Sequence, residues 1–171
     1  MLSLVAALIF LAPAAHAAVP KVLAIHFGPD LEVNPVTQGW VNHELNRAKN
    51  GGYDAAVIVL DTPGGLSTSM RKIYQKELAS KIPVIVYVAP DGARAGSAGL
   101  WIAEAADVLA MAPQTNIGAS TPIGIGGGDL DKDLRKKAIN DAAASVVALA
   151  KSHGRDPTFP ERAASIRRRM S

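Results

Sequence analysis

Two short apolar runs limit what this chain can fold into. Residues 55–60 read AAVIVL and residues 82–89 read IPVIVYVA, and each run leads into a turn that contains proline and glycine. A continuous run of β-branched residues is typical of a strand buried on both faces, as in a parallel sheet. Parallel strands need crossover helices between them, so the sequence predicts an α/β protein.

The rest of the chain fits this alternation. Besides the two runs above, the sequence predicts strands over 21–26 and 108–112, and the strand over 108–112 is expected to be another core strand. Helices are predicted over 38–49, 67–80, 98–106 and 131–153. In the first helix Trp40, Leu45 and Ala48 are expected near one face. Ser67 or Thr68 is the expected N-cap of the second. The last is expected to end at Gly154.

The first residues have the pattern of a secretion signal. An apolar run from Leu2 to Leu11 is followed by Pro13 and by Ala15-His16-Ala17, which matches a small-x-small cleavage site. We therefore expect residues 1–17 to be a signal peptide and residues 18–171 to form one domain, exported to the periplasmic or extracytoplasmic face of the membrane. The alternative is an uncleaved anchor, although the run is shorter than the roughly 20 residues that span a bilayer.

Composition excludes several chemistries. The chain of 171 residues has no cysteine, which excludes disulfides, thiolate nucleophiles and thiolate metal sites. No spacing of His, Asp and Glu resembles a metal site. No cofactor motif is present either, because the glycine run GIGGG at 124–128 follows no strand and precedes no GK[ST], as a phosphate-binding loop would. The net charge of +3 owes much to Arg167, Arg168 and Arg169, so it does not indicate a nucleic-acid partner.

Both buried runs end in glycine-rich turns. After residues 57–60 the chain reads DTPGGL, where Gly64 and Gly65 can adopt positive φ and expose backbone N–H groups. Such groups at the start of a helix attract an anion or a developing oxyanion. The alternative is an ordinary strand-to-helix turn.

The second turn holds a single serine, Ser97, between Gly96 and Ala98. It can be the N-cap of the following helix, or a nucleophile presented beside the positive end of that helix. The flanking glycines favour close approach of a substrate, and Gly64 and Gly96 are the expected substrate-binding positions. The spacing is not the G-x-S-x-G of α/β-hydrolases.

Three segments together resemble a known family. LDTPGGL, ARAGSAGLWIAEAADVLAMAPQTNIGASTPIG and KKAINDAAASVVALAKSHGRD are similar to the N-terminal domain of the NfeD family, over about Lys21 to Ala164. Members of that family are membrane-associated serine peptidases of the ClpP/crotonase fold, often paired with stomatin-like proteins. The resemblance implies that Ser97 is the nucleophile and that the N–H groups of Gly65 and Ala98 form the oxyanion hole.

The resemblance also implies a lysine base, three residues before an asparagine in the long helix. With Asn140 in that place, the base is Lys137. A lysine must be neutral to accept a proton, so its pKa has to fall from about 10.4 towards about 7–8, with Lys132 and Lys136 supplying part of the repulsion. Helical periodicity places Lys136 nearer the apolar stripe and makes it the alternative base, unless the helix begins near Ala138.

The implied function is that of an exported serine endopeptidase, which uses a Ser–Lys dyad to cleave hydrophobic peptides. A stomatin-like membrane protein is one possible target. The resemblance further implies membrane association and a homodimer or higher homo-oligomer. Family domains continue with a further helix, a strand and membrane helices, so this chain is predicted to be C-terminally short. A non-catalytic partner-binding remnant and a crotonase-type acyl-thioester enzyme are the alternatives.

Other polar residues are given structural roles. Asp61 is expected to support the turn after the first buried run, and Thr115, Asn116 and Ser120 are expected to form a turn. Residues 124–128 are expected to form a mobile loop over the cleft.

Overall fold

A computed structural model describes residues 19–118 and 131–165. Its main sheet has four parallel strands in the order β1-β2-β3-β5. Their bounds are Val22–Phe27 (β1), Ala55–Leu60 (β2), Val84–Val88 (β3) and Val108–Met111 (β5). The helices of the described residues are Pro35–Asn50 (α1), Ser67–Leu78 (α2), Ala98–Ala105 (α3), Lys132–Ser152 (α4) and Thr158–Ser165 (α5). The predicted α/β architecture with parallel strands is confirmed.

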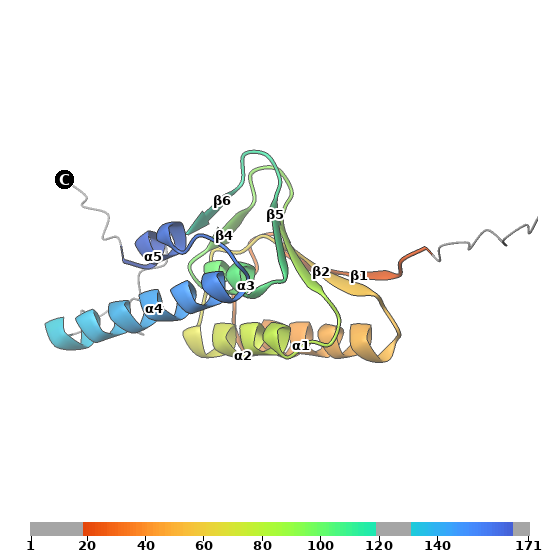
Figure 1. The fold of residues 1–171 in the computed structure, drawn as a ribbon, viewed down its shortest axis with the longest axis horizontal. Helices are drawn as coiled ribbons and strands as arrows, with labels where there is room; N and C mark the ends of the chain where they lie inside the picture. Colours follow the sequence, from red (N-terminus) through yellow and green to blue (C-terminus); the bar gives the residue numbers. More distant parts are fainter. Residues whose placement is uncertain (1–18, 119–130, 166–171) are drawn as a thin grey trace, which may run out of the picture.

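The main sheet is covered by helices on one face only. In Figure 1, α1 and α2 lie side by side below the sheet, and no helix lies on its opposite side. Ile25, Ile58 and Val86 point to the covered face and are at most 1% exposed. Their neighbours in the strands alternate with them, so that Val57 is only half-buried and Tyr87 is 38% exposed.

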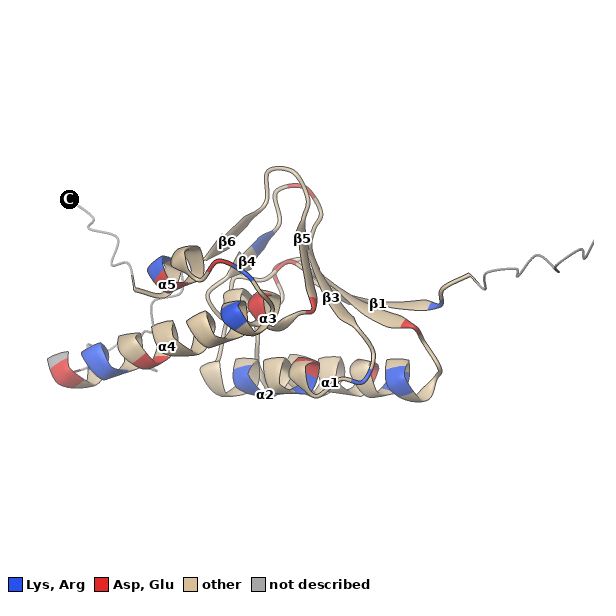
Figure 2. Ribbon diagram, viewed as in Figure 1, with Lys and Arg blue, Asp and Glu red and all other residues tan. Residues whose placement is uncertain are grey.

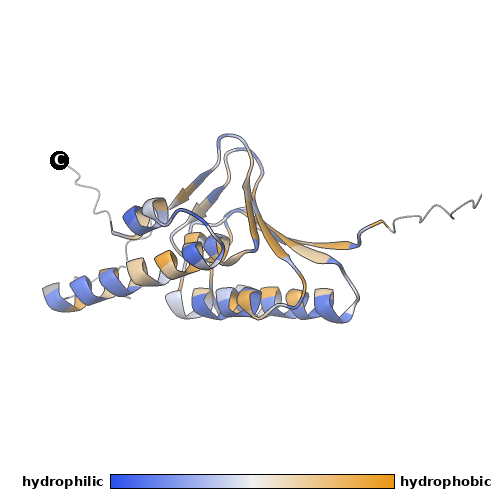
Figure 3. Ribbon diagram, viewed as in Figure 1, coloured by the Kyte–Doolittle hydropathy of each residue, from blue (hydrophilic) through white to orange (hydrophobic). Residues whose placement is uncertain are grey.

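The prediction that the two apolar runs are buried on both faces is therefore wrong. The residues are apolar on both sides, as the hydropathy of the strands in Figure 3 shows, but all the described helices that touch the sheet pack against the same side. The prediction of a third core strand over 108–112 is also wrong. β5 is an edge strand, and Val108 and Met111 are exposed.

The start of α1 and the N-cap of α2 differ from those predicted. α1 begins at Pro35 rather than at residue 38, because the Asn34 side chain accepts the N–H groups of Val36 and Thr37, and the Thr37 hydroxyl accepts the N–H of Asn34. This reciprocal capping box satisfies N–H groups that have no partner inside the helix. The buried face of α1 consists of Val41, Leu45 and Ala48, whereas Trp40 is 37% exposed.

α2 starts at Ser67, but neither Ser67 nor Thr68 caps it. The N-cap is Leu66, which makes no side-chain capping bond. The Leu66 N–H instead donates to the Val33 carbonyl oxygen at 2.7 Å, because the chain enters the helix directly from a β-bridge.

Three short elements were not predicted. Arg94–Gly96 (β4) and Asn116–Gly118 (β6) form a second, two-stranded parallel sheet, and α5 follows α4. Asn116 is thus a strand residue rather than part of a turn. Ser120 and the loop 124–128 lie outside the described residues.

α4 is a continuous helix close to the predicted range, with His153 as its C-cap and Gly154 at φ +68° just beyond. Lys137 therefore lies inside the helix, and the option of a helix that begins near Ala138 is excluded. Over residues 19–118 and 131–165, no helix combines the length and apolar character that crossing a membrane requires.

Candidate active site at two glycine-rich strand ends

Thr62 holds the turn that follows β2. Its side chain is buried, and its hydroxyl donates to the Leu31 carbonyl oxygen while accepting the Gly64 N–H at 3.1 Å. These two bonds tie the turn to the loop that follows β1. Asp61 contributes through its carboxylate, which accepts the Arg94 N–H at 3.1 Å, so it has a structural role at the neighbouring strand rather than in the turn itself.

A β-bridge fixes the direction of the Gly65 backbone. The Val33 N–H donates to the Gly64 carbonyl oxygen at 2.8 Å, and the Leu66 N–H donates to the Val33 carbonyl oxygen at 2.7 Å. In a parallel bridge the residue between the two bonding groups turns its own N–H and C=O the other way. The Gly65 N–H therefore points away from Val33, and Gly65 is exposed.

Gly65 leaves no room for another residue. A Cβ there would lie 2.2 Å from the Val33 carbonyl oxygen, and its φ is +150°. Gly64 is restricted in the same way, with φ +114° and a Cβ position 2.5 Å from the Cβ of Ser97. Both glycines are thus required by close backbone approach.

β4 brings the serine segment to this turn. The Thr62 N–H donates to the Arg94 carbonyl oxygen at 2.7 Å, and the Gly96 N–H donates to the Thr62 carbonyl oxygen at 3.0 Å. This pairing places Ser97 against Gly64, although the two are 33 residues apart in sequence. The two glycine-rich strand ends singled out in the sequence therefore meet at one place.

Ser97 has a strained backbone. It occupies the N-cap position of α3 with φ 46° and ψ −113°, and its side chain makes no capping bond. The interpretation of Ser97 as a capping side chain is therefore wrong. A non-glycine residue at positive φ costs free energy, and such strain is concentrated at functional sites. The Ser97 N–H donates to the Gly118 carbonyl oxygen at 2.9 Å, which anchors the turn to β6.

The start of α3 supplies a second backbone donor beside Ser97. Ala98 is the first residue of the helix, where N–H groups have no partner within the helix. Gly99 lets this first turn approach the other strand end, because a Cβ at Gly99 would lie 2.8 Å from Cγ2 of Thr62. The N–H groups of Gly65 and Ala98 thus belong to the two segments that flank Ser97.

The two candidate lysines lie on α4 and not next to the glycine turns. Lys136 and Lys137 are both exposed, so the structure shows no difference in burial that favours one of them. α4 packs on α3 through its other half, where Val146 and Leu149 are buried. In Figure 2 the charged residues of α4 are concentrated in its first half, and in Figure 3 the same half is hydrophilic.

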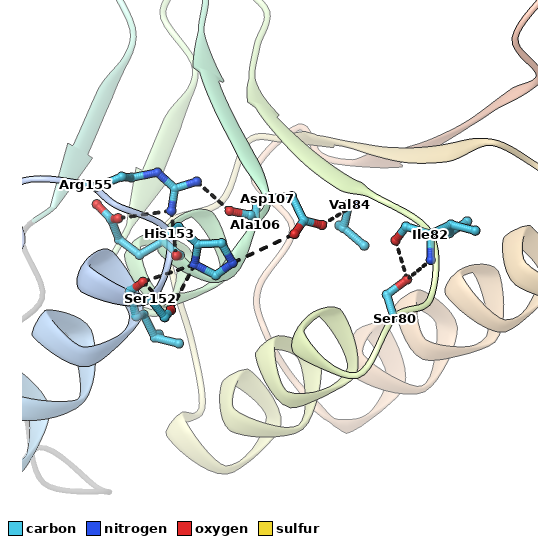
Figure 4. Close-up of polar contacts among 10 residues, drawn as sticks. Ser80, Ile82, Val84, Ala106, Asp107, Ser152, His153 and Arg155 are labelled. Carbon is cyan, nitrogen blue, oxygen red and sulfur yellow. Dashed lines mark hydrogen bonds and ion pairs between the residues drawn. The ribbon is translucent and has the colours of Figure 1, made fainter.

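A polar cluster that sequence reasoning missed lies at the other end of α3. The Arg155 guanidinium donates to the carbonyl oxygens of Glu104, at 2.8 Å, and of Ala106 (Figure 4). Burial raises the pKa of the Glu104 carboxyl, and Arg155 and His153 oppose this rise. His153 lies 4.0 Å from Asp107, so this histidine is at the opposite end of α3 from Ser97.

The remaining predicted site residues have no new role in the described structure. Asn140 is exposed on α4, and the Thr115 hydroxyl donates to the Ala112 carbonyl oxygen at 2.6 Å, which fits its expected role in a turn. Among the described residues, no group of His, Asp and Glu side chains could hold a metal ion.

Fold and site together define a ClpP-like α/β domain with a serine at the start of a buried helix. ClpP1 from Listeria monocytogenes superimposes with a TM-score of 0.63, covering 85% of this chain and 79% of that one, at 18% identity, which supports the fold alone. Residues 25–169 match the family model of the NfeD1b N-terminal domain, and the chain belongs to that family. The resemblance recognised in the sequence is confirmed.

Two curated relatives are similar in sequence. Membrane-bound protease PH1510 from Pyrococcus horikoshii is 38% identical over 131 residues, which are 76% of this chain and 30% of the relative. Membrane protein NfeD1b from Bacillus subtilis is 32% identical over 120 residues, which are 70% of this chain and 26% of the relative. The chain spans less than a third of the length of these relatives.

Solved structures of a stomatin-specific protease are also similar. A serine-to-alanine mutant of the 1510-N membrane-bound stomatin-specific protease has a TM-score of 0.76 and 34% identity, with 85% of this chain and 70% of that chain covered. A lysine-to-alanine mutant of the same protease, in complex with a substrate peptide, has a TM-score of 0.73 and 33% identity, with 85% and 66% covered.

Proposed function

We propose that this chain is a serine endopeptidase with Ser97 as its nucleophile. The observation that carries the proposal is the contact between Ser97, held at positive φ, and the Gly64-Gly65 turn. A strained strand-to-helix turn is a known way to present a serine hydroxyl. The relatives that are named as proteases support the same reaction class.

In the proposed reaction, the Ser97 hydroxyl oxygen attacks the carbonyl carbon of a peptide bond while the base takes its proton. The N–H groups of Gly65 and Ala98 stabilise the negative charge that develops on the carbonyl oxygen. The base then donates the proton to the leaving amine, and water hydrolyses the acyl-enzyme by the same steps.

We assign the base to Lys137, with Lys136 as the alternative. The assignment rests on the family pattern, and the direction of α4 is compatible with it, because α3 and α4 run in the same sense past their contacts. Because both lysines are exposed in the described chain, a bound peptide or a second subunit has to cover the one that acts. Exposure of both lysines is also the observation that favours the non-catalytic alternative.

The proposed substrate is an extended hydrophobic peptide, which contacts Gly64 and Gly96. Exposed apolar side chains support this class. Leu66, directly after Gly65, is 42% exposed, and Phe159, near the Gly118 that accepts the Ser97 N–H, is 46% exposed. The relative solved with a substrate peptide is described as stomatin-specific, and we propose a stomatin-like target here.

We further propose that the protein acts outside the cytoplasm at a membrane, as a homodimer or higher homo-oligomer. Relatives described as membrane-bound support the location. The sheet face without helices, which includes Tyr87, supports association with a second copy. Light scattering of the purified protein across concentrations tests this, and a monomer mass at every concentration contradicts it.

The test of the reaction is cleavage of hydrophobic peptides, combined with labelling by a fluorophosphonate. Wild-type protein is expected to cleave and to be labelled, whereas Ser97→Ala does neither. Lys137→Ala is expected to be inactive, and Lys151→Ala serves as the matched control because Lys151 is also exposed on α4.

Cleavage that survives in Ser97→Ala would exclude the proposed nucleophile. Loss in Lys136→Ala, with full activity in Lys137→Ala, would move the base by one residue. Folded wild type that neither cleaves nor is labelled would favour a partner-binding role.

A further inference from the structure

A hydrogen bond joins the helix that begins after Ser97 to the helix that carries the candidate bases. The Trp101 indole Nε1–H on α3 donates to the Ser145 Oγ on α4 at 2.8 Å, and the Ser145 hydroxyl donates to the Ala142 carbonyl oxygen at 2.9 Å. Trp101 is 4% exposed and Ser145 is half-buried, so this bond is partly shielded from water. Its loss leaves a buried donor without a partner.

Two contacts set the relative direction of α3 and α4. Trp101 in the middle of α3 meets Ser145, and the C-terminal end of α3 meets Arg155, which follows α4. The two helices therefore run in the same sense past these contacts, so the N-terminal half of α4 and the Ser97 end of α3 lie on the same side of the Trp101–Ser145 contact. Measured along the helix axes, Ser97 is about 6 Å from Trp101, and Lys137 is about 12 Å from Ser145.

The N-terminal half of α4 depends on the other half for its position. None of the described side chains over residues 133–141 is buried. The apolar residues of α4 that pack in one cluster with residues of α3 and α5 come later, namely Ala142, Ala143, Val146 and Leu149. Two of these are alanines, which form a shallow surface along which a helix can shift or rotate. A directional hydrogen bond fixes the register that such a surface leaves open.

We propose that the Trp101–Ser145 hydrogen bond is a positioning contact, which sets where the lysine-bearing half of α4 lies relative to Ser97. The proposal rests on the proposed function for its consequence in catalysis. Because Ser97 belongs to the α3 side of the contact and the lysines belong to α4, a small rotation of α4 about this point displaces the base relative to the nucleophile.

The geometry can be measured without activity. The chain has no cysteine, so spin labels can be placed through Asn140→Cys on α4 and Gln75→Cys on α2, both exposed positions. Pulsed electron paramagnetic resonance then reports the distance between them. We expect Ser145→Ala to broaden and shift the distance distribution and Ser145→Thr, which keeps the hydroxyl, to preserve it. An unchanged distribution in Ser145→Ala would overturn the proposal.

Ser152→Ala is the matched control. Ser152 lies on the same helix, and its hydroxyl donates to the Leu149 carbonyl oxygen at 2.8 Å, as that of Ser145 does to Ala142. The two tryptophans give a second readout. In a proton–nitrogen NMR spectrum, Ser145→Ala should move the Trp101 indole signal and speed its hydrogen exchange, while the Trp40 signal is unchanged.

Peptide cleavage gives the third readout. Ser145→Ala is expected to lower kcat by roughly tenfold to a hundredfold with little change in KM, since small displacements of a catalytic group have effects of that size. Ser145→Thr should restore kcat, and Ser152→Ala should leave it unchanged. A loss that Ser145→Thr does not restore would overturn the positioning role. If the wild type cleaves nothing, the proposed function fails, whereas the spin-label distances still decide the role of the contact.

Discussion

Gly64 is required for two separate reasons, its positive φ and the closeness of Ser97. Gly92, by contrast, has only the first. Gly92 has φ +82°, with nothing within 4 Å of a built Cβ, so alanine there meets conformational strain alone. The difference between the two positions therefore isolates the contact with Ser97.

We predict that Gly64→Ala destabilises the protein by about 2 to 4 kcal/mol, because strain and overpacking add, and that it abolishes labelling of Ser97. Gly92→Ala is predicted to cost about 1 kcal/mol and to leave labelling intact. Urea unfolding and fluorophosphonate labelling measure the two effects. Equal effects of the two substitutions would show that the contact with Ser97 does not matter.

A second residue-scale prediction concerns Glu77 on α2, whose side chain is buried and whose two carboxylate oxygens have no hydrogen-bond partner. Burial, with a smaller effect from Asp107, raises the pKa of Glu77 well above its usual value. The folded state then binds a proton that the unfolded state has lost. The free energy of unfolding should therefore fall as the pH rises from about 4.5 through the folded-state pKa.

Glu77→Gln is predicted to remove this fall, because glutamine does not titrate. The variant should be more stable than the wild type above the folded-state pKa. Urea unfolding at several pH values measures this, with Glu32→Gln, an exposed position, as the control. Identical pH dependence in Glu77→Gln and the wild type would contradict the prediction.

At the scale of elements, α3 is the central helix of the molecule. All eight of its residues are buried, because the sheet and α2 pack on one side and α4 on the other. Apart from Glu104 the helix is apolar all round, which is typical of such a position. Arg155 binds its C-terminal carbonyl groups, which carry partial negative charge.

We predict that Arg155→Met destabilises the protein by about 2 to 3 kcal/mol, since the two acceptors lose a charged donor and the Glu104 carboxyl loses its counter-charge. Arg155→Lys should recover only part of this, because an ammonium group cannot donate to both carbonyls with the fork of a guanidinium. Thermal and urea unfolding are the measurements. Full recovery by lysine would mean that charge alone is what matters.

The elements also show what the sequence could and could not predict. The β-branched runs identified β2 and β3, and the glycines beside Ser97 identified the candidate site, because both are local patterns. One-sided burial was not predictable, since apolar residues on both faces do not say which face the helices cover. β4 and β6 are too short to show a period, and the support that Thr62 receives from Leu31 is a contact distant in sequence.

On the scale of the whole molecule, the described residues form two hydrophobic clusters that share α3. The larger includes the main sheet with α1 and α2, and the smaller joins α3 to α4 and α5. Apart from Val146 and Leu149, the residues that α4 and α5 contribute to the smaller cluster are alanines, so the layer of α4 and α5 is the weaker part of the structure.

We predict that amides in α4 exchange with solvent through openings of lower free energy than those in β2 and β3. The first half of α4 should exchange fastest, since none of its described side chains is buried. Hydrogen–deuterium exchange followed by mass spectrometry at low denaturant measures this order. Simultaneous exchange of sheet and α4 would instead indicate a single cooperative unit.

The β-bridge at Val33 has a consequence for genetics. The Leu31 carbonyl oxygen accepts the Thr62 hydroxyl, Val33 holds the Gly64-Gly65 turn, and Asn34 caps α1. One short segment therefore connects a helix start to the candidate oxyanion hole. A mutational scan scored by peptide cleavage should therefore show sensitive positions at the buried Val33 and at the capping Asn34. Conventional interpretation would assign those positions to substrate contact, although their effect is exerted through the backbone of the turn.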